Sequence, residues 1–135
     1  MPEKETLERA RRDKREGKAP TTQAGEFVRE EIHHVREGKH GARSAKQAIA
    51  IGLSKARRAG VDLPPPRKGK KSTRRSAASA YRAGQRGKRK TSGRRARAVL
   101  RALKREPRRS TSRTALARQA RTATRRRRSP ARRAA

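Results

Sequence analysis

The sequence predicts an all-α protein in which a small helical hairpin follows a charged helix and precedes a basic, largely disordered tail. Apolar residues between positions 21 and 63 recur at helical spacing. Residues typical of helix starts and ends bracket these apolar runs. The chain of 135 residues is only 29% hydrophobic and has a net charge of +32. Most of it therefore cannot offset its conformational entropy by burying apolar surface.

Residues 1–20 are expected to form a charged helix and a short linker. Glu5 and Arg9 are one of several oppositely charged pairs at i,i+4 spacing, and each such pair stabilises a helix by only about 0.2–0.5 kcal/mol. The only apolar side chains able to pack are Leu7 and Ala10. A helix of this kind is marginal on its own.

A second helix is expected over residues 22–37, with Thr21 or Thr22 as its N-cap and Gly38 at its end. One stripe of this helix is apolar and consists of Ala24, Phe27, Val28, Ile32 and Val35. The opposite face is expected to be solvated and carries Glu26, Arg29, Glu30 and Glu31.

A third helix is expected over residues 45–59. Ser44 and Gln47 fit a capping box, in which a serine and a residue three positions later satisfy the free N–H groups of a helix start. Gly60 and Val61 fit a Schellman ending. Small and apolar residues share one face of this helix, which would let another helix approach closely: Ala45, Ala48, Ile49, Gly52, Leu53 and Ala56.

Residues 21–63 are therefore predicted to be a helical hairpin module made of helices 22–37 and 45–59. Its expected core consists of Phe27, Val28, Ile32, Val35, Ile49, Leu53 and Val61. A module of about 40 residues is near the size below which a single core is usually insufficient. We therefore expect a homodimer through the hairpin, or nucleic acid, to hold it firmly.

The composition changes after the hairpin. Residues 64–72 are a linker rich in proline and lysine, and residues 73–135 form an arginine-rich tail that is expected to be mostly disordered. Residues 67–135 contain 28 of the 43 lysines and arginines but only one acidic residue, Glu106. Two transient helices, at about 93–105 and 113–127, are expected to form when phosphates neutralise this charge.

One phrase in the third helix gives a family resemblance. The sequence Lys46-Gln-Ala-Ile-Ala-Ile-Gly-Leu-Ser-Lys-Ala56 matches the pattern K-Q-A-I-A-I-x-L-S-x-A. It resembles a family of small, highly basic bacterial proteins of uncharacterised function, some with a histone-like basic tail. The resemblance covers residues 1–66 most closely. It implies a bacterial cytoplasm and brings no reaction or ligand site with it.

The charge predicts a nucleic-acid partner. Dense arginine binds DNA by displacing counterions, and guanidinium groups match phosphate oxygens. We expect duplex DNA to be bound without sequence specificity by a nucleoid-associated protein of the cytoplasm. The alternative is an RNA-binding or ribonucleoprotein-assembly factor whose hairpin docks a protein. The expected nucleic-acid contacts are Lys46, Lys55, Arg57, Arg58, Arg74, Arg75, Lys88, Arg89, Lys90, Arg94, Arg95, Arg97, Arg101, Arg108, Arg109, Arg125, Arg126, Arg127 and Arg128.

Other function classes have little support in the sequence. It has no cysteine and no catalytic or nucleotide-binding motif, so we expect neither an enzyme nor a cofactor. No apolar run is long enough for a membrane span, and no membrane partner is expected. His33 and His34 point about 100° apart on a helix, so we expect no metal site and interpret the histidines as part of a solvated face. The acidic residues of positions 1–37 are expected to pair with the tail when no polyanion is present.

Overall fold

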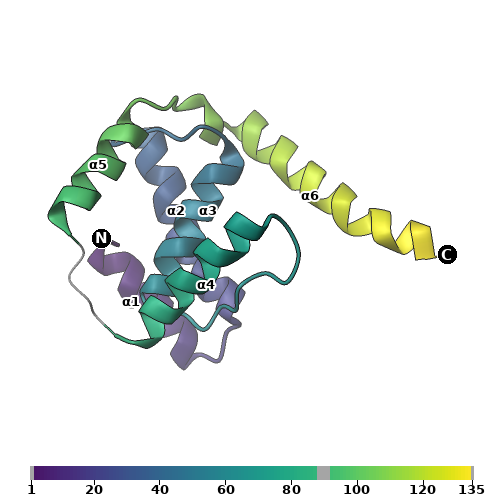
Figure 1. The fold of residues 1–135 in the computed structure, drawn as a ribbon, viewed down its shortest axis with the longest axis horizontal. Coiled ribbons are helices and arrows are strands. Elements are labelled where there is room, and N and C mark those ends of the chain that lie inside the picture. Colours follow the sequence, from purple (N-terminus) through teal and green to yellow (C-terminus); the bar gives the residue numbers. More distant parts are fainter. Residues whose placement is uncertain (1, 88–91, 135) are drawn as a thin grey trace.

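The computed structural model describes the backbone of residues 2–87 and 92–134, with side chains up to residue 128. The described residues form α-helices, one 3₁₀ helix and no strand, which confirms the all-α class. In Figure 1, the first four helices pack into one body, α5 lies at its side and α6 projects away from it. The elements are α1 (Lys4–Arg15), α2 (Pro20–Glu37), α3 (Ala45–Arg58), α4 (Lys71–Gln85), α5 (Gly93–Lys104), η1 (Arg109–Thr111) and α6 (Arg113–Ala134).

Small residues let α2 and α3 pack closely against each other. A Cβ added at Gly52 of α3 would lie 2.6 Å from Cα of Val28 on α2. Three alanines on the same face of α3, together with Gly52, are buried: Ala45, Ala48 and Ala56. The larger side chains predicted for this face, Ile49 and Leu53, are only half-buried. The α2–α3 contact therefore depends on close approach of the backbones more than on large side chains.

The end of α3 forms as the sequence predicts, and its start forms one half of the predicted capping box. The Ser44 hydroxyl accepts a hydrogen bond from the backbone N–H of Gln47, whereas the Gln47 side chain accepts from the N–H of Arg43 and not from that of Ser44. At the other end Gly60 has φ +99°, and the N–H of Val61 donates to the carbonyl of Ala56 at 3.1 Å. These bonds complete the Schellman motif.

The start of α2 differs from the prediction. The helix begins at Pro20, with Ala19 in the N-cap position and no side-chain cap, so Thr21 and Thr22 do not cap it. Proline fits the first helical position because its missing N–H would have no partner there. The end of α2 is as predicted, with Gly38 in the left-handed conformation at φ +81°.

The Ser44 cap gives a stability prediction. Replacing Ser44 with Ala is expected to lower the free energy of unfolding by about 1 kcal/mol, because one N–H at the start of α3 loses its acceptor. Chemical denaturation followed by circular dichroism measures this loss. Ser76→Ala, at an exposed position of α4, is the control and should change stability by less than about 0.5 kcal/mol. Equal losses in the two variants would contradict the capping role.

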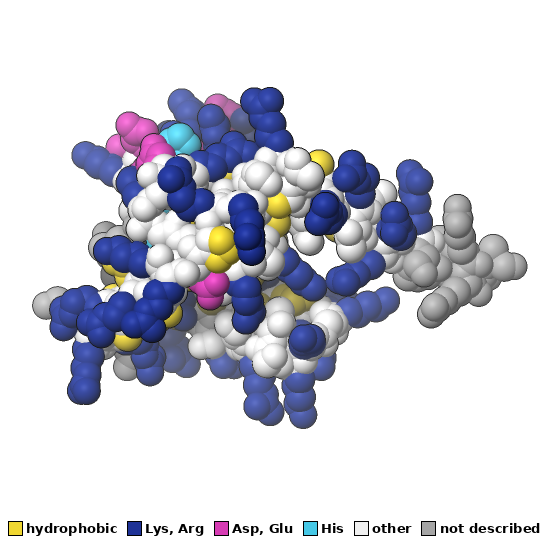
Figure 2. Space-filling model, turned by 90° about the horizontal axis from the view of Figure 1, so that it is seen from above, with side chains coloured by type: hydrophobic (Ala, Val, Ile, Leu, Met, Phe, Trp, Pro, Cys, Tyr) yellow, Lys and Arg dark blue, Asp and Glu magenta, His cyan; other side chains and the backbone are white. Residues whose placement is uncertain are grey.

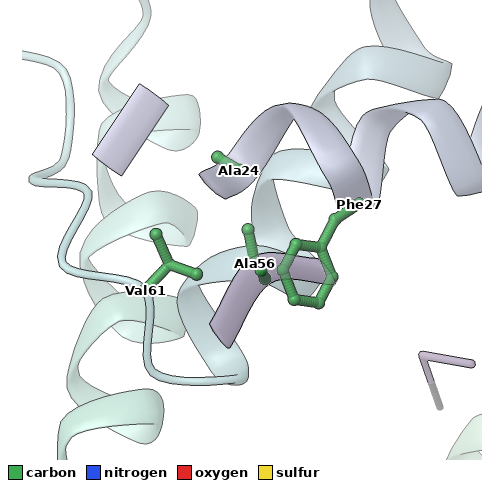
Figure 3. Packing of buried hydrophobic residues seen from close by; sticks show 5 residues of the cluster. Ala24, Phe27, Ala56 and Val61 are labelled. Atoms are coloured by element: carbon green, nitrogen blue, oxygen red, sulfur yellow. The ribbon is translucent and has the colours of Figure 1, made fainter. Parts of the chain in front are cut away.

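The core is small and rich in alanine. Phe27 is 1% exposed and is the largest fully buried side chain among the described residues. It packs in a cluster drawn from α1, α2, α3 and the chain after α3 (Figure 3), which consists of Ala10, Ala24, Phe27, Ala56 and Val61. A second cluster consists of Val35, Ala42 and Ala48. Phe27, Val35 and Val61 are thus buried as predicted, whereas Val28 and Ile32 are half-buried.

The expected solvated face of α2 is wrong at Glu30 and Glu31 and also at His34, which is 9% exposed; His40, in the loop after α2, is buried as well. Glu31 is fully buried and Glu30 is 4% exposed. Glu31 accepts a hydrogen bond from Lys55 of α3, and Glu30 accepts one from the backbone N–H of Glu3, just before α1. The prediction considered only α2 and α3. Because α1 also packs on α2, both flanks of the helix are covered.

The described part of the tail is helical, which corrects the expectation of disorder. The helix α4 was not predicted, and it begins inside the segment expected to be a linker. Its buried face is made of small residues: Ala77 and Ala80 are buried, and a Cβ added at Gly84 would collide with the carbonyl of Arg57 on α3. The other two helices, α5 and α6, overlap the ranges predicted to be transiently helical.

Candidate nucleic-acid interface

The tail segment 103–111 is fastened to the loop that follows α2. The backbone N–H of Gly41 donates to the carbonyl of Leu103 at 2.8 Å, and that of Ala42 donates to the carbonyl of Pro107 at 3.0 Å. A Cβ on Gly41 would collide with the backbone of this segment, so a glycine is needed for the close approach. These contacts place η1 and the start of α6 beside α3.

Two arginines reinforce this attachment. The guanidinium of Arg108 donates to the carbonyls of Val35 and Arg36 at the end of α2. In the other direction, Nε of Arg36 donates to the carbonyl of Thr111 at 3.1 Å. The last carbonyls of a helix carry partial negative charge and lack partners within the helix. Arg108 therefore caps α2 and holds the tail against it.

This arrangement forms a groove of about 490 Å³ between the start of α3, η1 and one face of α6. Two helices begin at its edge, each with a serine cap: Ser44 for α3 and Ser112 for α6, whose hydroxyl accepts from the N–H of Ala115. Helix starts carry partial positive charge. The lining contains four cations, five hydroxyl groups and no acidic side chain: Arg43, Ser44, Ala45, Lys46, Arg109, Ser110, Ser112, Thr114, Ala115, Arg118, Gln119 and Thr122.

The groove has the chemistry of a phosphate-binding surface. Arg43, Lys46, Arg109 and Arg118 are exposed and none of them pairs with a carboxylate among the described residues. Arginine, lysine, serine and threonine side chains, together with the N–H groups of helix starts, are the usual donors to phosphate oxygens.

Two of the predicted contacts face inward instead. The side chain of Lys55 pairs with the buried carboxylate of Glu31. Arg57 is 8% exposed and donates to the carbonyls of Leu63 and Pro64 at 3.1 and 3.2 Å. Burial lowers the pKa of the Arg57 guanidinium from its usual range. Lys55 and Arg57 are therefore not part of the candidate interface.

The other predicted contacts are distributed over the surface. Lys46 and Arg109 line the groove, and Arg108 is exposed while also bonding to α2. Three predicted contacts, Lys88, Arg89 and Lys90, lie outside the described residues. The rest are exposed on α3 to α6 and are Arg58, Arg74, Arg75, Arg94, Arg95, Arg97, Arg101, Arg125, Arg126, Arg127 and Arg128. Figure 2 shows how lysine and arginine side chains cover the face in view, with few acidic ones between them.

The acidic residues do not pair with the tail in the described structure, contrary to our expectation. Their lysine and arginine partners are Arg9, Lys18, Lys39 and Lys55, all in the first 55 residues. Beyond Arg57, each lysine and arginine with a described side chain is exposed, and none of them pairs with a carboxylate. The tail cations thus remain available to an external anion.

The sequence analysis missed Arg43 and Arg118. A signal for the second was present, because Ala115, Arg118 and Thr122 recur at helical spacing and so share one face of α6. Arg43 directly precedes the serine cap of α3, a position that places a cation beside a helix start. What the sequence did not show is that the two helix starts lie on the same groove.

Comparison with known proteins gives a resemblance without an activity. Residues 5–68 match the model of a family described as a family of unknown function (DUF6496). The match runs from α1 to the segment before α4 and leaves α4, α5 and α6 outside it. Neither the curated proteins nor the solved structures gave a match. Among the described helices, none is both long enough and apolar enough to cross a lipid bilayer.

Proposed function

We propose that this protein is a nucleoid-associated, histone-like protein that binds duplex DNA without sequence specificity and compacts it. The proposal rests on where the positively charged side chains of the protein lie. Beyond Arg57, the lysines and arginines with described side chains are exposed and lack carboxylate partners. Such a surface repels itself until a polyanion neutralises it, and DNA presents one phosphate about every 1.7 Å of duplex.

The groove and α6 have complementary roles in this proposal. The groove offers a fixed set of donors for a few phosphates, because backbone bonds at Gly41 and Ala42 hold its two walls together. The projecting helix α6 (Figure 1) carries Arg125–Arg128 away from the body, where they can reach phosphates further along the duplex or on a second duplex. The α2–α3 pair serves as the anchor for both. Contact with two stretches of DNA is what compaction requires.

The aromatic residues favour duplex DNA over single strands. Proteins that bind single strands without sequence preference stack bases on exposed aromatic rings. Phe27 is 1% exposed. Tyr81 is half-buried and its hydroxyl donates to Asp62, an interaction that raises the pKa of the tyrosine. The two aromatic side chains of the chain therefore form no stacking platform.

A salt titration tests the proposal. The full-length chain is titrated with several unrelated fluorescent duplexes, and anisotropy gives the dissociation constant at each salt concentration. With six to ten phosphate contacts, affinity should fall by about 10³–10⁵ between 50 and 200 mM salt, equally for all sequences. A salt-independent affinity, or a strong preference for one duplex, would contradict the proposal.

Competition with RNA tests the alternative of ribonucleoprotein assembly. Structured RNA hairpins are added to the preformed protein–duplex complex at equal phosphate concentration. If backbone charge on duplex DNA is the main determinant, RNA should displace the duplex no better than unlabelled DNA does. Displacement by a tenfold lower amount of RNA would instead favour the RNA-binding function.

A further inference from the structure

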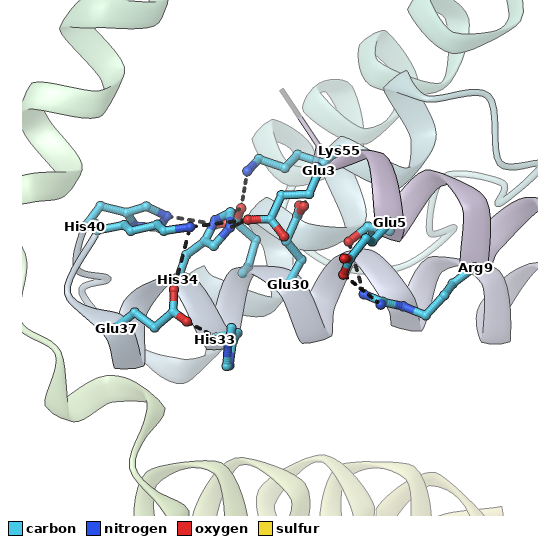
Figure 4. Close-up of polar contacts among 12 residues, drawn as sticks. Glu3, Glu5, Arg9, Glu30, His33, His34, Glu37, His40 and Lys55 are labelled. Carbon is cyan, nitrogen blue, oxygen red and sulfur yellow. Dashed lines mark hydrogen bonds and ion pairs between the residues drawn. The ribbon is translucent and has the colours of Figure 1, made fainter.

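Three side chains at the end of α2 converge beneath the surface. Glu31 and His34 come from α2, and His40 from the loop after it; they are 0%, 9% and 7% exposed. Nε2 of His40 lies 3.1 Å from Oε2 of Glu31, and Nδ1 of His34 lies 3.8 Å from Oε1 of the same carboxylate. One nitrogen or oxygen atom from each residue lies within 4.8 Å of the other two. Figure 4 shows the two rings beside each other.

The remaining nitrogen of each ring is held by a hydrogen-bond acceptor. Nδ1 of His40 donates to the carbonyl of Gly41 at 2.9 Å, and Nε2 of His34 donates to the carboxylate of Glu3 at 3.0 Å. Carbonyl and carboxylate oxygens only accept, so these nitrogens carry the ring protons. In neutral rings, the other nitrogens therefore present lone pairs to Glu31. Metal-binding histidines almost always have their second nitrogen anchored in this way.

The buried carboxylate has an unsatisfied oxygen. Oε1 of Glu31 accepts a hydrogen bond from Lys55, but Oε2 has no hydrogen-bond partner among the described residues although it is buried. Its neighbour, Nε2 of His40, is close enough at 3.1 Å but is not aligned for an N–H···O bond. A buried carboxylate oxygen that is left unsatisfied destabilises the folded state. A cation placed off the line between Oε2 of Glu31 and Nε2 of His40 would give this oxygen a partner and remove this destabilisation.

The spacing is close to that of the ligands of a tetrahedral metal ion. Ligands at about 2.0–2.1 Å from zinc, with tetrahedral angles between them, lie about 3.3–3.4 Å from one another. One ligand atom from each of the three residues lies within 4.8 Å of the other two, so small side-chain shifts would bring both nitrogens and one oxygen of Glu31 to this spacing. Two imidazoles and one carboxylate are a known zinc ligand set, which leaves a fourth position for water or another small ligand. Borderline metals such as zinc prefer imidazole nitrogen, whereas magnesium and calcium prefer oxygen.

We propose that Glu31, His34 and His40 bind a divalent transition-metal ion of the zinc type. This proposal departs from the expectation from sequence that the chain has no metal site. That expectation compared His33 with His34, and the structure confirms that these two diverge: His33 is exposed and pairs with Glu37 at 2.8 Å. The partner of His34 is instead His40, which the left-handed turn at Gly38 brings back over α2.

A second group near the first fits a metal less well. Glu3, Glu30 and His34 also place ligand atoms within 4.8 Å of one another. However, Glu3 is exposed, and its carboxylate already accepts bonds from His34 and Lys39, which lower its pKa. We interpret Glu3 as the residue that orients His34.

The ion would stabilise the loop after α2, which holds the walls of the groove together. His40 precedes Gly41 and Ala42, whose N–H groups hold the tail segment in place. A metal bound to His40 and to two residues of α2 would hold this loop against α2. The proposed role is therefore structural and does not depend on the DNA-binding function.

Metal binding is tested on nucleic-acid-free, full-length protein. After treatment with a chelator and its removal, the protein is titrated with ZnCl₂ by calorimetry. We expect one tight site per chain, and a melting temperature about 10 °C higher at a Zn²⁺ concentration 100 times the dissociation constant. Titration with Co²⁺ should give the visible absorption of a tetrahedral site with nitrogen and oxygen ligands.

Neighbouring histidines provide the variants and the control. His40→Gln and His34→Gln each remove a ligand, which should cost at least as much as the roughly 100-fold that loss of a ligand-orienting group can cost; both should nearly abolish the thermal shift. His33→Gln removes an imidazole one position away on the same helix and should leave both unchanged. The proposal fails if the natural chain binds no Zn²⁺, if Co²⁺ gives no tetrahedral spectrum, or if His40→Gln binds zinc as tightly as His33→Gln does.

Discussion

Replacing Gly52 with Ala is expected to destabilise the protein strongly. The added methyl carbon would lie 2.6 Å from Cα of Val28 and 2.9 Å from its backbone nitrogen, and neither atom can move without moving α2. Overpacking usually costs about 1–3 kcal/mol, and the upper end applies when the obstacle is backbone. The greater helix propensity of alanine offsets at most about 1 kcal/mol of this loss. The melting temperature should fall by about 10 °C.

Gly25 provides the control for this experiment. It also lies inside a helix, α2, but a Cβ there would meet no atom within 4 Å. Gly25→Ala should therefore raise the free energy of unfolding by about 0.5–1 kcal/mol, because alanine loses less conformational freedom on folding. Urea denaturation of both variants measures the difference. If Gly52→Ala were as stable as Gly25→Ala, the close packing of α2 and α3 would be wrong.

The local features of the fold could be predicted because each depends on a few neighbouring residues. The Ser44 cap, the end of α2 at Gly38 and the ending at Gly60 and Val61 all formed where their residue types require them. Phe27 was predicted to be buried because it lies in the apolar stripe of α2. These features need no information about distant parts of the chain.

The features that were missed depend on contacts between distant segments. The glutamates of α2 are polar by type, and their burial requires α1 and α3 to cover the helix. The small residues Ala77, Ala80 and Gly84 of α4 are spaced at three and four positions, but small residues give little hydrophobic signal until a partner helix is known. The same holds for His40, whose position relative to His34 depends on a loop.

The sequence predicts that the candidate interface is cationic, but it does not predict which cations lie together. Net charge predicts a polyanionic partner from composition alone. It does not show which cations are used internally, as Arg57 is, or which are brought together, as Arg43 and Arg118 are. Those outcomes follow from the docking of residues 103–111 on the loop after α2, through main-chain bonds whose partners cannot be identified from the residue types.

The largest effect on DNA binding is expected when the arginine run Arg125–Arg128 is changed to glutamine. These residues are exposed on the projecting helix α6. Losing up to four phosphate contacts should reduce the slope of log K against log salt by about 3–4, and affinity at 0.1 M salt should fall by at least about 100-fold. Glutamine favours helix about as well as arginine, and removing like charges at i,i+4 relieves repulsion. A loss of affinity would therefore not result from unfolding of α6.

A matched variant shows whether the position of the removed charges matters or only their number. Arg11, Arg12, Lys14 and Arg15 are exposed near the end of α1 and form no ion pair among the described residues. Changing all four to glutamine leaves the same net charge as the α6 variant, four below the natural +32. Because α1 lies among the acidic residues, away from the groove, affinity should fall by less than about fivefold, through the long-range field alone. Equal losses would mean that net charge, and not α6, governs binding, whereas an unchanged affinity of the α6 variant would place the contacts elsewhere.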